Sequence, residues 1–170
     1  MPPLPSLLRA ALVVVTLHFN PAHADDAPML QTTMAAVFTV HSADAEDRFL
    51  GSAFLWRDGA VAVSNAHVVG QATAVRLTDQ RGQQQIGQVI AVDPSRDVAV
   101  IAVQPGQSGL VPAPDAPQIG AEVWALGAPL DLAFSVTAGH ISALDRQTIA
   151  TAPIRMIQHD AALNPGSSGG

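Results

Sequence analysis

From residue 35 onward, the chain consists of short apolar or alternating runs that are separated by turn-forming residues. No stretch keeps a helical period of about 3.6 residues, whereas alternation with a period of two is typical of strands that bury one face. The pattern therefore predicts an all-β fold. The strands expected in the first half are Ala36–His41, Phe49–Arg57, Ala60–Ser64, Thr73–Thr78, Gln84–Val92 and Val98–Val103.

Turn signals join several of these strands into hairpins. Asp58-Gly59 separates the second and third expected strands, and Arg81-Gly82 separates the fourth and fifth. Asp and Gly both tolerate positive φ, which the favoured two-residue hairpin turns require. Six short antiparallel strands can close a small barrel, which leaves no sheet edge exposed. We therefore expect residues 35–103 to form one barrel.

A different composition follows at residues 104–119, where repeated prolines and glycines break any strand ladder, so this segment is predicted to be a linker. Residues 120–170 show fewer strands than the first half. Since an open sheet leaves an unpaired apolar edge, we expect an incomplete second barrel and a sequence that is part of a longer protein. The strands expected here are Glu122–Leu126, Ala133–Ala138, His140–Leu144 and Arg155–His159.

Residues 1–24 have the features of a secretory signal peptide. Arg9 supplies a positive charge, residues 10–19 are apolar, and Ala22-His23-Ala24 is a small-x-small cleavage site. Prolines argue against the alternative of a buried N-terminal helix, and the apolar stretch is shorter than the roughly 20 residues that span a bilayer. We predict cleavage after Ala24, a secreted or periplasmic location without stable membrane insertion, and an N-terminal extension over residues 25–34.

The composition excludes several kinds of chemistry. Of 170 residues, 48% are hydrophobic, and the formal net charge is −6, so no cationic face suited to nucleic acid is expected. The chain has no cysteine, which removes disulfides, thiolate nucleophiles and cysteine-based zinc sites. We predict a protein that binds no nucleic acid and uses no metal or other cofactor.

The C-terminal motif Asn164-Pro165-Gly166-Ser167-Ser168-Gly169-Gly170 is a candidate nucleophile turn. Its glycines permit a tight backbone path that exposes a side chain, and their spacing favours Ser168 over Ser167. Converging N–H groups of Gly166 and Ser168 would form an oxyanion hole, in which each donor is worth about 3–4 kcal/mol. The alternative is a flexible Gly/Ser linker.

Two further residues have the chemistry that such a serine needs. His67 follows the expected strand Ala60–Ser64, and a neutral imidazole can take a serine's proton; a histidine among Ala and Val is alternatively a core residue. Asp97 precedes a strongly apolar strand, where a histidine N–H would satisfy its carboxylate. Its alternatives are a turn cap or an ion pair with Arg96, and the nearest rival, Asp93, looks like an Asx-type turn residue.

In chain order, His67, Asp97 and Ser168 match the chymotrypsin-type arrangement of a catalytic triad. The chain resembles trypsin-like serine proteases of the HtrA/Deg type over roughly residues 35–170. The segments that carry the resemblance are Gly51–Leu55, Ser64–Val69, Asp97–Val100, Val136–Gly139 and Gln158–Gly170.

This resemblance implies two antiparallel Greek-key barrels of the chymotrypsin type, the second incomplete here, with the site between them. His67 then matches the general base, Asp97 the orienting acid and Ser168 the nucleophile, while Gly166 and Ser168 match the oxyanion donors. The resemblance also implies endopeptidase cleavage of unfolded or misfolded polypeptides, and assembly as a homotrimer.

Three positions depart from the family pattern. Ser167 stands where the family usually has asparagine and digestive trypsins have aspartate, so we expect no activation by a freed amino terminus. Ala162 stands six residues before the nucleophile, where trypsin has its specificity acid, so the pocket is expected to prefer small or branched apolar side chains. His159 replaces the usual threonine and is expected to be a cleft-lining or surface residue and no metal ligand.

The sequence therefore predicts a serine endopeptidase that acts through an acyl-enzyme in the quality control of exported proteins. One alternative is a noncatalytic, chaperone-like barrel that binds unfolded chains with its oxyanion loop collapsed; another is a secreted β-protein in which the motifs coincide by chance. Because no strands follow Gly170, residues 25–170 alone are expected to be poorly folded and inactive.

Overall fold

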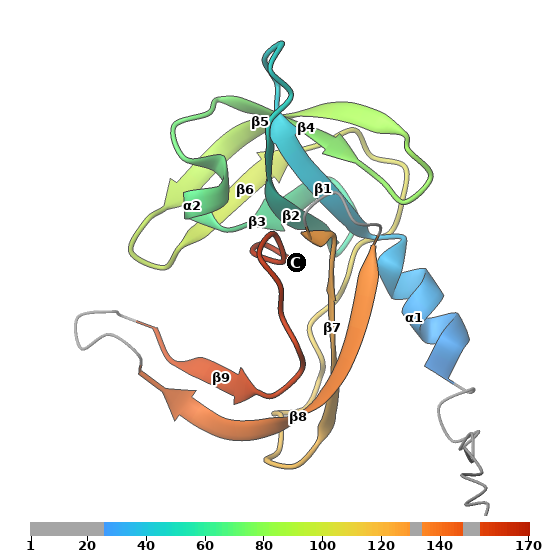
Figure 1. Cartoon of the computed structure of the whole chain (residues 1–170), viewed down its shortest axis with the longest axis vertical. Coiled ribbons are helices and arrows are strands. Elements are labelled where there is room, and N and C mark those ends of the chain that lie inside the picture. The colour runs from blue at the N-terminus through green and yellow to red at the C-terminus, as the bar shows by residue number, and fades with distance from the viewer. Residues whose placement is uncertain (1–25, 130–133, 148–153) are drawn as a thin grey trace, which may run out of the picture.

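The computed structural model describes residues 26–129, 134–147 and 154–170 (Figure 1). The predicted signal peptide, residues 1–24, lies outside the described residues. In chain order, the elements are α1 (Ala27–Met34), β1 (Val37–Ser42), β2 (Phe49–Trp56), β3 (Val61–Ser64), α2 (Ala66–Val69), β4 (Ala74–Thr78), β5 (Gln84–Asp93), β6 (Val98–Ala102), β7 (Glu122–Gly127), β8 (Ser135–Arg146) and β9 (Met156–His159).

The first six strands form a closed antiparallel barrel in the order β1-β2-β3-β6-β5-β4. The chain leaves β3, forms β4 and β5, and returns as β6 beside β3, which makes the connection a Greek key. Buried and less buried residues alternate along β4 and β6, because alternate side chains of a strand point into the barrel. The prediction of an all-β fold is confirmed. The buried core consists of Ala36, Phe38, Val40, Ala53, Leu55, Ala62, Val68, Val69, Val75, Leu77, Ala99 and Ile101.

The turn between β2 and β3 differs from the prediction of a two-residue turn at Asp58-Gly59. Strand pairing ends at Trp56 and Val61, so residues 57–60 form the connection. Positive φ occurs at Arg57 (53°) and Gly59 (76°), whereas the Asp58 carboxylate accepts a hydrogen bond from the N–H of Ala60 (3.1 Å). The aspartate thus stabilises the turn through its side chain instead of adopting positive φ.

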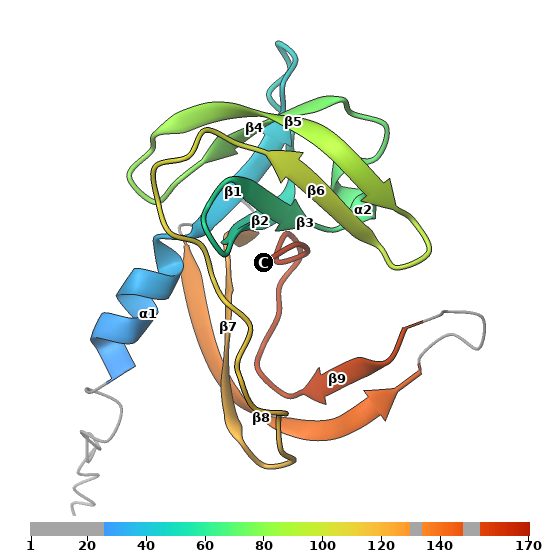
Figure 2. The same cartoon turned by 180° about the vertical axis from the view of Figure 1, so that it is seen from behind.

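Residues after β6 pack along the barrel before they enter the second sheet. Leu110 pairs with β2: its N–H donates to the carbonyl of Leu55 (2.8 Å), and its carbonyl accepts from the N–H of Arg57 (2.9 Å). Strands β7, β8 and β9 then form a three-stranded antiparallel sheet that does not close. Figure 2 shows this sheet beyond the barrel and the C-terminal segment returning from β9 to the barrel.

Strand β8 is one long strand where the sequence predicted two, Ala133–Ala138 and His140–Leu144. The expected break falls at Gly139, and Ala133 lies outside the described residues. A Cβ on Gly139 would lie 2.2 Å from the backbone nitrogen of Ala161, so this glycine permits close packing of two backbone segments instead of a turn.

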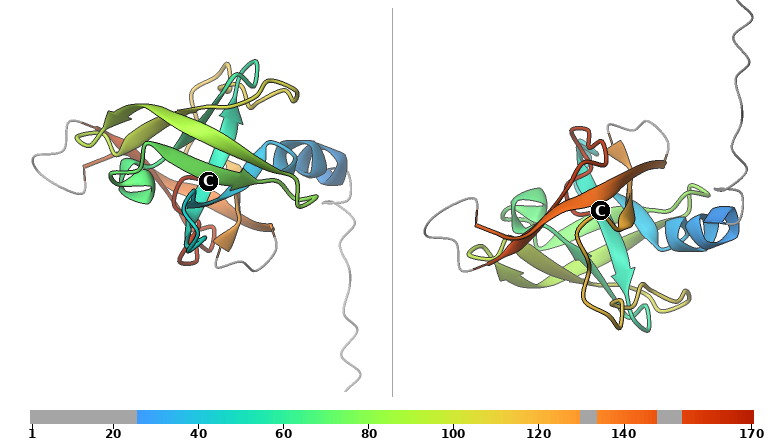
Figure 3. Two further views of the ribbon diagram at one scale, coloured as in Figure 1. Left: turned by 90° about the horizontal axis from the view of Figure 1, so that it is seen from above. Right: turned by 90° about the horizontal axis from the view of Figure 1, so that it is seen from below.

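Helix α1 was not predicted from the sequence. Only Met34 of its residues is buried, so no apolar stripe marks it in the sequence. The helix projects to one side of the barrel (Figure 3). Among the described residues, no helix is both long enough and apolar enough to cross a membrane.

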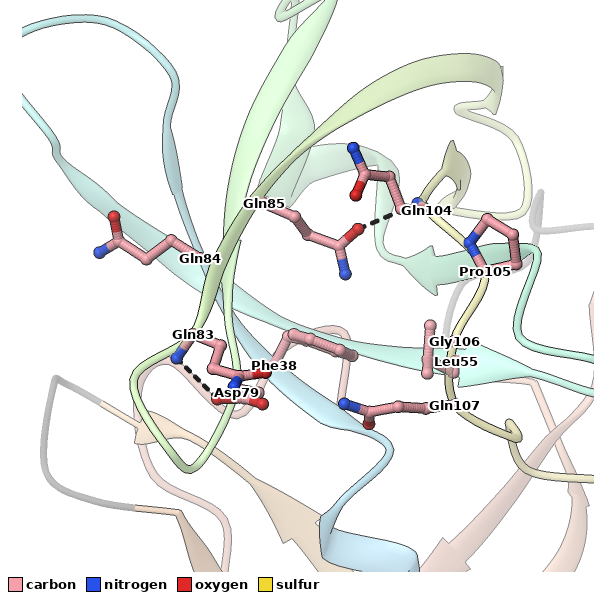
Figure 4. Close-up of a pocket in the computed structure, with 10 residues that line it drawn as sticks. All are labelled: Phe38, Leu55, Asp79, Gln83, Gln84, Gln85, Gln104, Pro105, Gly106 and Gln107. Atoms are coloured by element: carbon pink, nitrogen blue, oxygen red, sulfur yellow. Dashed lines mark hydrogen bonds between the residues drawn. The ribbon is translucent and has the colours of Figure 1, made fainter.

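The end of the barrel where β6 finishes holds a glutamine-rich pocket of about 290 Å³ (Figure 4). Gln104 donates its N–H to the side chain of Gln85 (3.0 Å), and Asp79 accepts from the N–H of Gln83 (2.8 Å). Since β3 and β6 are antiparallel, this pocket lies at the opposite end from helix α2, which follows β3.

Candidate active site

His67 is presented by helix α2, a single turn that begins as soon as β3 ends. Asn65 is extended (φ −81°, ψ 149°), and Gly70 ends the helix with positive φ (54°). Ala66, Val68 and Val69 are buried, whereas the His67 side chain is 58% exposed. His67 is therefore not a core histidine; the short helix anchors its neighbours and leaves the imidazole accessible.

Asp97 ends the turn between β5 and β6 with φ 55°. Asp93 organises this turn, because its Oδ1 accepts from the N–H groups of Ser95 (3.0 Å) and Arg96 (3.2 Å). Arg96 also pairs with Asp93 (2.7 Å), which leaves the Asp97 carboxylate to a different partner. The ion pair between Arg96 and Asp97 that the sequence left open does not form in the described structure.

His67 and Asp97 meet through both carboxylate oxygens. Nδ1 of His67 lies 2.7 Å from Oδ2 of Asp97, and the backbone N–H of His67 donates to Oδ1 (2.9 Å). Asn65 donates its side-chain N–H to the Asp97 carbonyl (2.8 Å). These contacts fix the imidazole's orientation, and they favour the proton on Nδ1, which leaves Nε2 free to accept another.

The surroundings favour the ionised form of Asp97. Burial raises the pKa of this carboxyl, but the backbone N–H and the imidazole of His67 lower it, and the net result is a pKa below the ordinary 3.8. Asp97 is thus a carboxylate that can accept an imidazole N–H across the neutral pH range.

Ser168 lies in a pair of consecutive turns. The N–H of Ser167 donates to the carbonyl of Asn164 (3.0 Å), and the N–H of Gly170 donates to that of Ser167 (3.0 Å). The third residue of each turn is a glycine with positive φ, Gly166 (95°) and Gly169 (89°). The segment is therefore a defined turn and not a flexible linker.

The N–H groups of Gly166 and Ser168 are not used within this turn. Among the described residues, neither N–H donates a hydrogen bond. Ser167 instead ties the turn together, because its Oγ accepts from the N–H of Asn164 (3.4 Å) in addition to its backbone bond. The two predicted oxyanion donors are thus available to a ligand.

The Ser168 turn and helix α2 meet the barrel at the same glycine. A Cβ on Gly51 would lie 2.9 Å from the Ser168 carbonyl oxygen and 2.9 Å from Cγ2 of Val68, the residue after His67. The N–H of Ser52 donates to the Ser168 carbonyl (2.8 Å). Within the described part of the chain, no hydrogen bond joins the Ser168 hydroxyl to His67. Of the three predicted triad residues, His67 and Asp97 are therefore in direct contact, and the Ser168 turn lies beside them.

A cavity of about 960 Å³ lies next to this turn, between the barrel and the open sheet. His159 is half-buried and lines the cavity, as does Leu163. Ala162, the predicted specificity residue, is exposed and lies outside the cavity lining; its carbonyl accepts from the Thr137 hydroxyl (2.7 Å). Across the described residues, no cluster of three metal-ligating side chains occurs.

Comparison with known proteins identifies the family of this chain. The family profile for the trypsin-like peptidase domain matches residues 51–170. The chain belongs to the trypsin-like peptidase family. HhoA of Synechocystis sp., a putative serine protease, is 35% identical over 165 residues, which cover 92% of this chain and 41% of HhoA. A probable periplasmic serine endoprotease, DegP-like, of Halomonas elongata is 34% identical over 127 residues, which cover 74% of this chain and 27% of the relative.

Solved structures agree with this assignment. The HtrA-type protease AlgW with a tripeptide has a TM-score of 0.75 and 27% identity, covering 84% of this chain and 48% of AlgW. The serine endoprotease from Yersinia pestis has a TM-score of 0.73 and 28% identity, covering 91% of this chain and 53% of that structure. The resemblance to HtrA-type proteases is confirmed. This trypsin-like domain spans about half of these structures and less than half of those two relatives.

The sequence missed two groups that organise the site of this trypsin-like domain. Asn65 holds the Asp97 backbone, and Ser52 holds the Ser168 turn across a large separation in sequence. Asn65 stands within the His67 motif, so its position was visible but its partner was not. In the sequence, Ser52 looks like an ordinary strand serine, because the neighbouring residues do not indicate which distant segment it contacts.

Proposed function

We propose that this chain carries the catalytic machinery of a serine endopeptidase that cleaves unfolded or misfolded exported proteins through an acyl-enzyme. The observation that carries the proposal is the exposed His67 imidazole held by Asp97 at 2.7 Å, beside a turn whose Gly166 and Ser168 amides are unused. Relatives named as probable periplasmic DegP-like endoproteases, and AlgW structures with bound peptides, support the substrate class and the site of action.

In the proposed reaction, Oγ of Ser168 attacks the carbonyl carbon of the scissile peptide while Nε2 of His67 takes its proton. The tetrahedral oxyanion accepts hydrogen bonds from the N–H groups of Gly166 and Ser168. Asp97 stabilises the imidazolium, which then protonates the leaving amine as the C–N bond breaks. Water, deprotonated by His67, hydrolyses the remaining ester and regenerates the Ser168 hydroxyl.

We also propose that export precedes activity, since residues 1–24 have the pattern of a signal peptide.

Specificity is proposed to favour small or branched apolar side chains. No Asp or Glu is among the described residues that line the cavity beside the proposed nucleophile turn, and Ala162, which lies outside this lining, adds no charge nearby. A cationic side chain would have no carboxylate to pair with there.

Casein hydrolysis by the native gene product that carries this chain tests the proposal. Ser168→Ala should lower turnover by about 10⁴-fold or more, while binding of unfolded casein persists, since binding does not need the hydroxyl. Ser108→Ala, at an exposed serine outside the site, is the matched control and should leave turnover unchanged. Cleavage sites mapped by mass spectrometry should follow small or branched apolar residues.

The casein experiment also separates the peptidase from the chaperone-like barrel. The relatives are named as proteases, which favours the peptidase. Equal turnover by the Ser168→Ala and Ser108→Ala variants, or binding with no cleavage by the unmodified protein, would contradict the peptidase proposal. Cleavage mainly after Arg or Lys would contradict the proposed specificity but leave the peptidase proposal standing.

A further inference from the structure

Ser52 on β2 is fully buried, yet its polar groups all take part in hydrogen bonds. Its Oγ donates to the carbonyl of Gly166 (2.8 Å) and accepts from the N–H of Ala128 (3.0 Å). Its N–H donates to the carbonyl of Ser168 (2.8 Å), and its carbonyl accepts from Oγ of Ser64 (2.7 Å). One residue of the barrel therefore contacts both the nucleophile turn and the segment that follows β7.

The two carbonyls that Ser52 binds stand on either side of one peptide group. That group joins Ser167 to Ser168 and carries the Ser168 N–H, one of the two proposed oxyanion donors. A planar peptide changes direction only by rotation about the bonds that flank it. The Ser167 carbonyl of this same peptide accepts from the N–H of Gly170 (3.0 Å), and Ser52 holds the peptides on both sides of it, so the peptide's rotation and the direction of its N–H are restrained.

Close packing adds to this restraint. A Cβ on Gly169 would lie 2.1 Å from the Ser52 carbonyl oxygen and 2.4 Å from Oγ of Ser64. The turn therefore lies directly on the buried Ser52 and Ser64 pair, with no space for a side chain at Gly169. The turn cannot shift toward the barrel, and the hydrogen bonds of Ser52 oppose a shift away from it.

A hydroxyl is the group that this position requires. A serine hydroxyl both donates and accepts, and here it donates to Gly166 and accepts from Ala128. Alanine at position 52 would remove the hydrogen-bond partner of the Gly166 carbonyl and of the Ala128 N–H. Ala128 is only 1% exposed, so water could not easily replace the lost partner. The polar side chain is thus explained by the turn that it holds and not by the packing of the barrel.

We infer that Ser52 is a positioning residue for the Ser168 N–H, one of the two proposed oxyanion donors. It acts through the backbone of residues 166–168 and does not touch the substrate. The inference rests on the proposed peptidase function and identifies what orders the oxyanion turn in a chain that has Ser167 where digestive trypsins have aspartate.

Steady-state kinetics of a peptide substrate test the inference in the native gene product. Ser52→Ala should lower kcat roughly 10- to 100-fold with KM changed less than about twofold, because oxyanion donors act in the transition state. Ser42→Ala is the matched control. Ser42 is also a buried barrel serine, and its Oγ donates to Asp44 (2.6 Å) and accepts from the N–H of Arg48 (2.9 Å), away from the turn. This variant should keep kcat within about twofold of the unmodified protein.

Residue-resolved amide hydrogen exchange gives a readout that does not depend on activity. In Ser52→Ala, exchange at Ala128 and within residues 164–170 should accelerate about 10-fold or more, while exchange in the barrel core stays unchanged. Unchanged kcat in Ser52→Ala, or a lower kcat without faster exchange in the turn, would overturn the inference. If the unmodified protein shows no serine-dependent turnover, the peptidase proposal fails, and exchange alone then decides whether Ser52 holds the turn.

Discussion

Asp97 combines an uncommon backbone conformation with the central contact of the site. Its φ of 55° lies in the left-handed region, which non-glycine residues seldom adopt. The His67 N–H bound at Oδ1 and the Asn65 amide bound at the carbonyl hold the residue in this conformation. The carboxylate consequently faces the imidazole of His67 and not the solvent-facing guanidinium of Arg96.

This arrangement predicts a pH-dependent contribution of Asp97 to stability. Burial raises the pKa of Asp97, the His67 contacts lower it, and the folded pKa lies below the ordinary 3.8. A lowered folded pKa stabilises the fold above pH 3.8, and this stabilisation is lost as pH falls through the folded pKa. The side chains of His67 and Asp97 are both partly exposed, which weakens their interaction. We therefore expect the free energy of unfolding of the unmodified protein to exceed that of Asp97→Asn by only about 1 kcal/mol at neutral pH.

Denaturant unfolding of both proteins over a pH series measures this effect. The difference in unfolding free energy should be constant near neutral pH and shrink below about pH 4. A difference that stays constant or grows as pH falls would mean that the Asp97 carboxylate is not stabilised by the His67 contacts.

At the scale of elements, the Ser168 turn consists of two glycine-dependent turns in succession. Gly166 and Gly169 both have positive φ, and each is the third residue of its turn. The backbone bonds of these turns use the N–H groups of Ser167 and Gly170, so those of Gly166 and Ser168 are left available. The hydrogen-bond pattern that closes the two turns therefore leaves the N–H groups of Gly166 and Ser168 unused within the turn.

A comparison of Gly169→Ala with Gly82→Ala distinguishes the cost of backbone strain from the cost of a clash with the barrel. Gly82 has a similar φ (77°) but nothing within 4 Å of an added Cβ, so alanine there should destabilise the fold by about 1–2 kcal/mol. Gly169→Ala adds a clash with the Ser52 carbonyl and should destabilise by at least about 1 kcal/mol more, with loss of casein turnover. Equal unfolding free energies and equal turnover for the two variants would show that the turn does not press on β2.

At the scale of the whole molecule, the site is assembled by contacts between segments far apart in the chain. The Ser52 hydroxyl and the Gly166 carbonyl are 114 residues apart, yet they lie 2.8 Å from each other. The C-terminal segment returns to the barrel after passing through the open sheet (Figure 1). The second sheet thus carries the Ser168 turn to His67 and Asp97, which both belong to the first barrel.

The sequence predicts the parts of this assembly that depend on local rules. Alternation of apolar residues predicted the strands of the barrel. Glycine spacing favoured Ser168 over Ser167 as the nucleophile, which stays a prediction. The sequence did not predict helix α1, which buries only Met34, or the continuity of β8, where Gly139 serves packing instead of a turn. It also missed the partner of Ser52, because a buried strand serine has the same local pattern whichever distant carbonyl it binds.

Labelling with a serine-directed fluorophosphonate, followed by mass-spectrometric mapping of the adduct, tests the central claim most directly. In the native gene product, the account predicts a single adduct on Ser168, with none on the adjacent Ser167. No adduct on Ser168 at any pH, or an adduct on Ser167 in its place, would contradict the assignment of His67, Asp97 and Ser168 as one catalytic unit.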